Sequence, residues 1–187
     1  MSDYSLNDGL SSALFSADRS ADIPQASDLY GWLVGSWDLR VLVHESDGSE
    51  TTHRGAIHAG WVLQGRAIQD VFDVPGFFYG TSVRFYDPQL QAWQVFWMDP
   101  MKQVFMRLLG RQKGNDIVNE GKETPELARA YGLVPDPDAR IQWNFTDITA
   151  QSFRWVSLRS NDGENWVLQR EYFGQRRAES QAHRDRP

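Results

Sequence analysis

The sequence predicts an all-β protein built as one antiparallel, up-and-down barrel of about ten strands, and three observations favour that fold. Apolar and polar residues alternate with a period of two from residue 36 onward. Turn signals such as Asp-Gly, Asp-Pro and Pro-Gly recur about every ten residues, a spacing typical of barrels and sandwiches. No long crossover separates successive segments, which favours a lipocalin-like closed barrel over a Greek-key sandwich.

The elements follow one another in a simple order. Residues 1–26 are a polar arm, and 28–34 predict a short helical turn that ends at Gly35. The predicted strands then cover residues 37–43, 51–63, 66–72, 78–86, 93–98, 104–111, 117–121, 141–145, 153–159 and 166–173. A barrel of about ten strands is wider than an eight-stranded one, so we expect an interior cavity.

One short helix interrupts the strands. Thr124 is its expected N-cap, Pro125 its first residue and Gly132 its end. We therefore divide the chain into the N-terminal arm, a single barrel domain over 27–174 and a charged, flexible tail over 175–187.

Composition and charge exclude several classes of function. The chain has 187 residues, no cysteine and a formal net charge of −6. Without cysteine there are no disulfides, thiolate metal sites, iron–sulfur clusters or thiol nucleophiles. The acidic balance argues against a nucleic-acid partner, which needs concentrated Lys and Arg. Because the sequence shows neither a signal peptide nor a long apolar run, we expect a cytoplasmic protein that makes no membrane contact.

Several motifs carry a resemblance to a known superfamily. Gly35-Ser36-Trp37 resembles the Gly-x-Trp signature of the lipocalin (calycin) superfamily, whose Trp closes one end of the barrel against an Arg from a late strand. The resemblance implies Arg170 as that Arg. Longer stretches resemble an uncharacterised bacterial family of calycin-like barrels related to the nitrobindins, namely residues 60–70, 86–88, 93, 97–100, 143–145 and 160–166.

This resemblance spans residues 28–173 and implies the barrel fold, which hosts carriers, haem proteins and enzymes alike. Nitrobindins bind haem through a His in a late strand, but residues 166–173 contain no His. We therefore expect no haem and no other cofactor.

The four histidines do not predict a metal site. His44 and His53 flank the first hairpin, but His53 and His58 point to opposite faces of a regular strand, and His183 lies in the tail. A metal needs three or four convergent ligands, so we expect none. Nucleotide-binding glycine motifs and a Gly-x-Ser-x-Gly elbow are also missing from the sequence.

Charged residues within aromatic strands predict a polar patch in the interior. An Arg beside a carboxylate in an aromatic cavity can orient a polar ligand or stabilise an oxyanion, and a desolvated carboxylate can act as acid or base. Asp70, Glu171 and Arg84 are the candidate catalytic residues, and Arg66 and Arg107 are candidate ligand-binding residues. We expect Asp70 to pair inside with at least one of these arginines. The alternative is that each charge points outward or forms a structural ion pair.

Aromatic residues make up 13% of the chain, more than a sealed small core needs, which favours a planar or polycyclic guest. Trp61, Trp97, Trp143 and Trp155 are the candidate ligand-binding rings, with core packing as the alternative.

Two functions follow. In the first, the barrel binds a hydrophobic or aromatic small molecule and acts on it as a cofactor-independent isomerase or cyclase. In the second, it is a non-catalytic carrier or sensor. An unpaired carboxylate with a shifted pKa at the cavity wall would favour the enzyme, whereas an apolar wall would favour the carrier.

The strands from 78 to 109 are apolar on both faces. An apolar outer surface needs a cover, so we expect a two-fold homodimer. The alternative cover is the N-terminal arm, through Leu10, Leu14 and Phe15.

Overall fold

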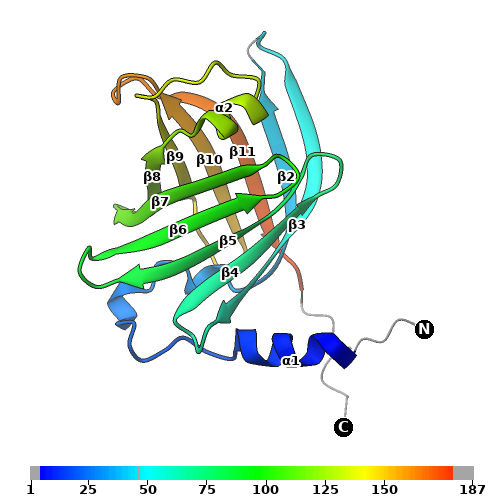
Figure 1. Ribbon diagram of the computed structural model, residues 1–187, viewed down its shortest axis with the longest axis vertical. Helices are drawn as coiled ribbons and strands as arrows, with labels where there is room; N and C mark the ends of the chain where they lie inside the picture. Colours follow the sequence, from blue (N-terminus) through cyan, green and yellow to red (C-terminus); the bar gives the residue numbers. More distant parts are fainter. Residues whose placement is uncertain (1–4, 46, 179–187) are drawn as a thin grey trace.

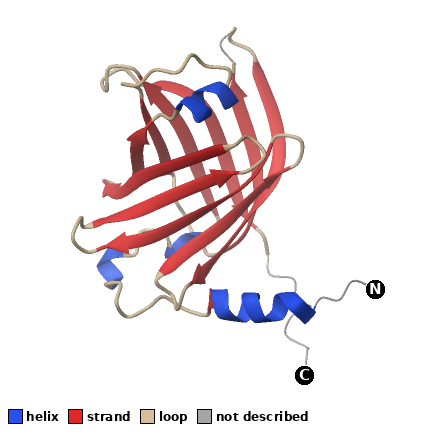
Figure 2. Cartoon of the chain, viewed as in Figure 1, coloured by secondary structure: helices blue, strands red, loops and turns tan. Residues whose placement is uncertain are grey.

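The computed structural model describes residues 5–45 and 47–178. Within them, the ten longer strands of one antiparallel sheet close into a barrel (Figure 1). Each strand from β2 to β10 pairs with the strand that follows it in the chain, and β11 closes the barrel by pairing with β2. The predicted all-β barrel is confirmed. Figure 2 shows how little of the described chain is helical.

The strands match the predicted segments closely, and each end lies within three residues of its predicted position. The barrel strands are β2 (Gly35–His44), β3 (Glu50–Val62), β4 (Ala67–Val74), β5 (Phe78–Asp87), β6 (Ala92–Asp99), β7 (Val104–Lys113), β8 (Asp116–Lys122), β9 (Arg140–Thr146), β10 (Ser152–Ser160) and β11 (Val167–Arg176).

The N-terminal arm contains regular structure that the sequence analysis missed. It forms helix α1 (Ser5–Leu14) and strand β1 (Phe15–Ser16), which pairs with the end of β3. The 3-10 helices η1 (Gln25–Ser27) and η2 (Gly31–Leu33) follow. Polar residues hid the helical spacing of the arm's leucines, which recur every four residues.

Trp37 closes the end of the barrel beneath η2. Its ring is fully buried, and its indole N–H donates to the Leu33 carbonyl at 2.8 Å. The guanidinium over this ring belongs to Arg176, 4.0 Å from the ring centroid, so the expected pairing with Arg170 is wrong. Arg176 also donates to the Val34 carbonyl at 2.8 Å. Gly35 has a φ of +124°, which residues with a side chain rarely adopt, and a Cβ there would also meet Arg176 Nη1 at 2.6 Å; together these explain the glycine of the motif.

The last strand is longer than the sequence predicted. β11 ends at Arg176, beyond the predicted domain boundary at 174. The predicted tail from residue 179 onward lies outside the described residues.

The opposite end of the barrel carries helix α2 (Pro125–Ala130), as predicted (Figure 1). The Thr124 hydroxyl caps it by accepting the Leu127 N–H at 3.2 Å. Leu127 is fully buried, so the helix is anchored on the barrel by its apolar side. No helix in the described part of the chain is long and apolar enough to cross a membrane.

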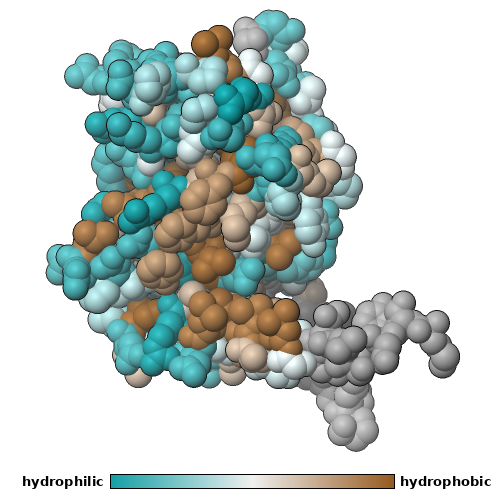
Figure 3. Space-filling model, viewed as in Figure 1, coloured by the Kyte–Doolittle hydropathy of each residue, from teal (hydrophilic) through white to brown (hydrophobic). Residues whose placement is uncertain are grey.

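The outer face of β5, β6 and β7 exposes large apolar side chains. Tyr79, Met98 and Phe105 are each about half exposed, and Phe85 stacks on Phe96 with ring centroids 5.7 Å apart. Brown and tan residues gather over these strands in Figure 3. Helix α1 lies along the bottom of the barrel in Figure 1, so the arm does not cover the patch.

The homodimer stays a prediction, now with a defined surface. We expect light scattering at micromolar concentration to give twice the chain mass of 21.5 kDa. The variant Phe105→Lys, which places a charge in the patch, should give the mass of one chain. A single-chain mass for the unmodified protein would contradict the dimer.

Candidate functional site

The interior of the barrel holds a cavity of about 40 Å³. Eight aromatic rings, one valine and five polar side chains line it: Phe72, Phe78, Ser82, Arg84, Val95, Trp97, Asp99, Lys102, Asn119, Tyr131, Trp143, Phe145, Trp155 and Tyr172. This volume holds roughly three water molecules, whereas a cavity that takes benzene measures about 150 Å³. A wide cavity for a polycyclic guest was expected, and that expectation is wrong.

The rings themselves fill the space. Trp155 stacks on Tyr172 with centroids 4.2 Å apart, and Trp143 packs against Trp155 at 5.8 Å and against Trp97 at 6.3 Å. Protein interiors pack densely, so the extra width of a ten-stranded barrel is taken up by larger side chains. Trp97, Trp143 and Trp155 line the cavity as predicted, while Trp61 is buried elsewhere in the core.

Asp70 and Arg84 form a buried ion pair at one end of the cavity. Asp70 is 1% exposed and Arg84 4% exposed. Arg84 donates through Nη1 to Asp70 Oδ2, and the Ser82 N–H donates to Asp70 Oδ1 at 3.0 Å. The prediction that Asp70 pairs inside with an arginine is confirmed. Because both carboxylate oxygens are engaged, Asp70 is not the unpaired acid that an acid–base enzyme needs.

The other predicted charges lie on the outside of the barrel. Glu171 alternates with the cavity residue Tyr172, so it faces outward, where Arg154 pairs with it at 2.6 Å. Arg66 is half exposed and pairs with Asp22 at 2.6 Å.

Arg107 also points outward, from β7, and donates to Gln94 Oε1 at 2.8 Å. The expectation that Glu171, Arg66 and Arg107 reach the cavity is therefore wrong.

A hydrogen-bonded chain beside the ion pair was not predicted. The Tyr30 hydroxyl donates to Asn119 Oδ1, and Asn119 Nδ2 donates to the Trp143 carbonyl. Burial raises the pKa of Tyr30, so its hydroxyl stays a donor. Gly110 is required here because a Cβ would overlap the Tyr30 oxygen. The available sequence signal was Asn119, a polar residue at an inward position of its strand.

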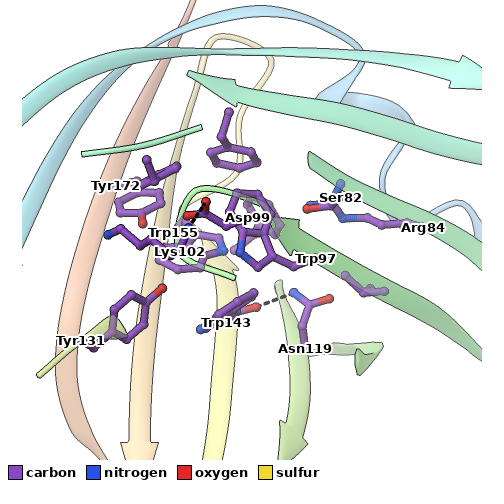
Figure 4. Close-up of a pocket in the computed structure, with 14 residues that line it drawn as sticks. Ser82, Arg84, Trp97, Asp99, Lys102, Asn119, Tyr131, Trp143, Trp155 and Tyr172 are labelled. Atoms are coloured by element: carbon purple, nitrogen blue, oxygen red, sulfur yellow. Dashed lines mark hydrogen bonds between the residues drawn. The ribbon is translucent and has the colours of Figure 1, made fainter. Parts of the chain in front are cut away.

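The other end of the cavity, its mouth, is also polar. Figure 4 shows Asp99, Lys102, Tyr131 and Tyr172 gathered on one side and Ser82 and Arg84 on the other. Asp99 Oδ1 accepts the N–H groups of Met101 at 3.0 Å and Lys102 at 3.1 Å, which fixes the β6–β7 turn.

Burial and the charge of Arg170 lower the pKa of Lys102, and burial raises the pKa of Tyr172. None of these mouth residues was predicted as part of the site.

Two donors of the cavity wall have no acceptor among the described residues. They are Trp143 Nε1 and Arg84 Nε, both fully buried. A buried donor without a partner costs about 1–3 kcal/mol, so these atoms favour an acceptor supplied by water or a ligand.

The histidines do not gather. His44 bonds to Glu50, His58 to Ser36, and His53 stacks on Phe77. His183 lies outside the described residues. Among residues 5–45 and 47–178, no group of three His, Cys, Asp or Glu side chains is placed to hold a metal ion.

Fold and site together define a closed antiparallel β-barrel with a small, ring-lined interior cavity. Sixteen chains of solved structures match it. One is Rv2717c from M. tuberculosis, with 13% identity and a TM-score of 0.55 over 84% of this chain and 100% of that one. Another is a redesigned β-barrel, b11L5F_LGL, with 12% identity and a TM-score of 0.34 over 87% and 99%.

The likeness to Rv2717c supports the barrel fold. No family model matches the chain, and no curated protein does either. The resemblance to the nitrobindin-related family stays a prediction.

Proposed function

We propose that this protein binds a small molecule inside the barrel, between Trp97, Trp143 and Trp155, and acts as a carrier or sensor. The observation that carries the proposal is the buried Trp143 Nε1, a hydrogen-bond donor that belongs to a residue of the cavity wall and has no acceptor among the described residues. A ligand with an acceptor atom would satisfy this donor, and the rings around it would cover the ligand's apolar part.

The cavity volume limits the ligand. About 40 Å³ accepts a few non-hydrogen atoms, such as the polar head of a larger molecule. The apolar body of a larger ligand would then extend past the mouth, beside the half-buried Lys102 of the β6–β7 turn. The aliphatic stem of a lysine can cover apolar surface at such a border with water.

An isomerase or cyclase without a cofactor is the second candidate. It is favoured by Tyr172, whose buried hydroxyl stays protonated and can donate to a developing oxyanion. Acid–base work would then fall to Asp99, which lines the cavity, and not to Asp70 or Glu171. It ranks second because Asp70 is paired on both oxygens and Glu171 lies outside the barrel.

Ligand binding is tested by native mass spectrometry of freshly purified protein together with titration of an environment-sensitive dye. We expect a bound mass that denaturation releases, and saturable dye binding that quenches tryptophan fluorescence. The variant Val95→Phe adds a ring inside the cavity and should weaken the dye about tenfold or more, provided that its circular dichroism is unchanged. Met98→Phe on the exposed outer face is the matched control. Unsaturable dye binding and no bound mass would contradict the proposal.

A further inference from the structure

Two positively charged side chains meet at the mouth of the barrel. Arg170 is 6% exposed, and its Cζ lies 3.3 Å from the centroid of the Tyr131 ring and 5.2 Å from that of Phe77. The Lys102 ammonium lies over the same two rings, 4.4 Å from the Phe77 centroid and 5.7 Å from that of Tyr131. The positive charge of Arg170 helps to lower the pKa of Lys102, as expected of like charges held close together.

Neither cation has an acidic partner among the described residues. No carboxylate oxygen there lies within 4.0 Å of Lys102 or Arg170, and Arg170 Nη1 is buried without a hydrogen-bond acceptor. Asp99 is the nearby acid, and its Oδ1 already accepts two backbone N–H groups. Contacts with aromatic rings and the nearby Tyr172 hydroxyl offset only part of the cost of burying Arg170 Nη1 without an acceptor.

The charges around Lys102 and Arg170 do not cancel. The charged groups that act on the pKa of Lys102 are Arg170 and Asp99, so two cations face one acid, and these three groups together carry one positive charge in excess. Arg159, on the neighbouring strand β10, is paired with Glu123 at 2.8 Å. Two tyrosine hydroxyls complete the surroundings, since Tyr131 and Tyr172 lie on the same side of the cavity as Lys102 (Figure 4).

We propose that Lys102 and Arg170 bind the carboxylate of an acidic small molecule at the mouth of the barrel. This inference rests on the proposed function and names its ligand class. A planar carboxylate matches the guanidinium of Arg170, its single charge matches the excess, and its size suits the cavity. The apolar body of the ligand lies against the surrounding rings.

Benzoate and benzamide test the proposal, because they have nearly the same size and differ in charge. The affinity of each compound is measured by how well it displaces the dye from the full-length protein at neutral pH. We expect benzoate to bind about tenfold tighter or more, the effect of one charge-assisted hydrogen bond. Added salt should weaken the binding of benzoate and leave the binding of benzamide unchanged.

Variants locate the effect. In Lys102→Met the preference for benzoate should disappear, and Lys102 is half-buried in a turn, so the variant is expected to fold. Lys113→Met, at the exposed end of β7, is the matched control and should keep the preference. Arg170→Lys keeps the charge and should retain part of the preference for benzoate, whereas Arg170→Met should lose it.

The outcomes separate the two proposals. Equal binding of benzoate and benzamide, or dye binding that neither compound displaces, overturns the carboxylate site and leaves the proposed function standing. Absence of saturable dye binding contradicts the proposed function itself. A benzoate preference that survives in Lys102→Met and Arg170→Met means that these side chains only hold the barrel end together, which also overturns the inference.

Discussion

The variant Arg84→Met should lower the free energy of unfolding by about 3–5 kcal/mol. Asp70 is 1% exposed, and the substitution leaves its carboxylate charged in the interior with only the Ser82 N–H as a partner. Removing one member of a desolvated pair costs far more than the pair contributes as a whole, because the remaining charge has no solvent. Urea titration followed by tryptophan fluorescence measures the change.

A matched control comes from an exposed pair. Arg66 and Asp22 lie 2.6 Å apart with both side chains more than half exposed, so Arg66→Met should cost less than about 1 kcal/mol. The double variant Asp70→Leu with Arg84→Met should recover part of the loss, since it removes both charges. A loss below about 1 kcal/mol in Arg84→Met would show that water reaches the pair, contrary to the geometry described above.

The variant Trp37→Ala should cost about 3–5 kcal/mol, because it removes a fully buried indole ring at the closed end of the barrel. The loss includes the hydrogen bond to the Leu33 carbonyl and the surface on which Arg176 lies. Thermal and urea unfolding measure it. Trp37→Phe keeps most of the ring and should cost less.

Tyr79→Ala is the control for this substitution. Tyr79 is 51% exposed on the outer face of β5, so its removal should change stability by about 0.5 kcal/mol or less. An equal loss in the two variants would show that Trp37 does not close the barrel end.

Residue faces were predictable where a strand alternates cleanly. In β4, Ile68, Asp70 and Phe72 share one face, and the structure places all three inside. In β6 and β7 apolar residues occupy both faces, so alternation could not show that Arg107 points outward. Aromatic residues occupy outward positions of these strands where polar residues are usual, so apolar and polar residues do not alternate and the inward face cannot be assigned.

The mouth of the barrel could not be predicted because its residues come from separate elements. Lys102 is in a turn, Tyr131 follows α2, and Arg170 is in the last strand. Lys102 and Tyr131 each fit an exposed position in their own segments, and the family resemblance placed Arg170 at the opposite end of the barrel. Closure of the sheet between β2 and β11, with α2 packed on the barrel, brings them together, and no local pattern records that closure.

The size of the cavity was the other limit. Strand number sets the width of a barrel, whereas the volume left inside depends on how the inward side chains pack. Trp155 stacked on Tyr172 fills space that smaller residues would leave open. The sequence therefore predicted the enclosure and overestimated the room within it.

The most direct test of a ligand site inside the barrel is a two-dimensional ¹H–¹⁵N NMR titration that follows the indole N–H signals, assigned with single Trp→Phe variants. Trp32, Trp37 and Trp93 donate to backbone carbonyls at 2.7 to 2.8 Å, whereas Trp143 Nε1 has no acceptor among the described residues. With benzoate and benzamide as probes, we predict that the Trp143 signal shifts and saturates with at least one of them, while the other three signals stay in place. An unchanged Trp143 signal at saturating probe, or equal shifts of all four, would contradict a ligand site in this cavity.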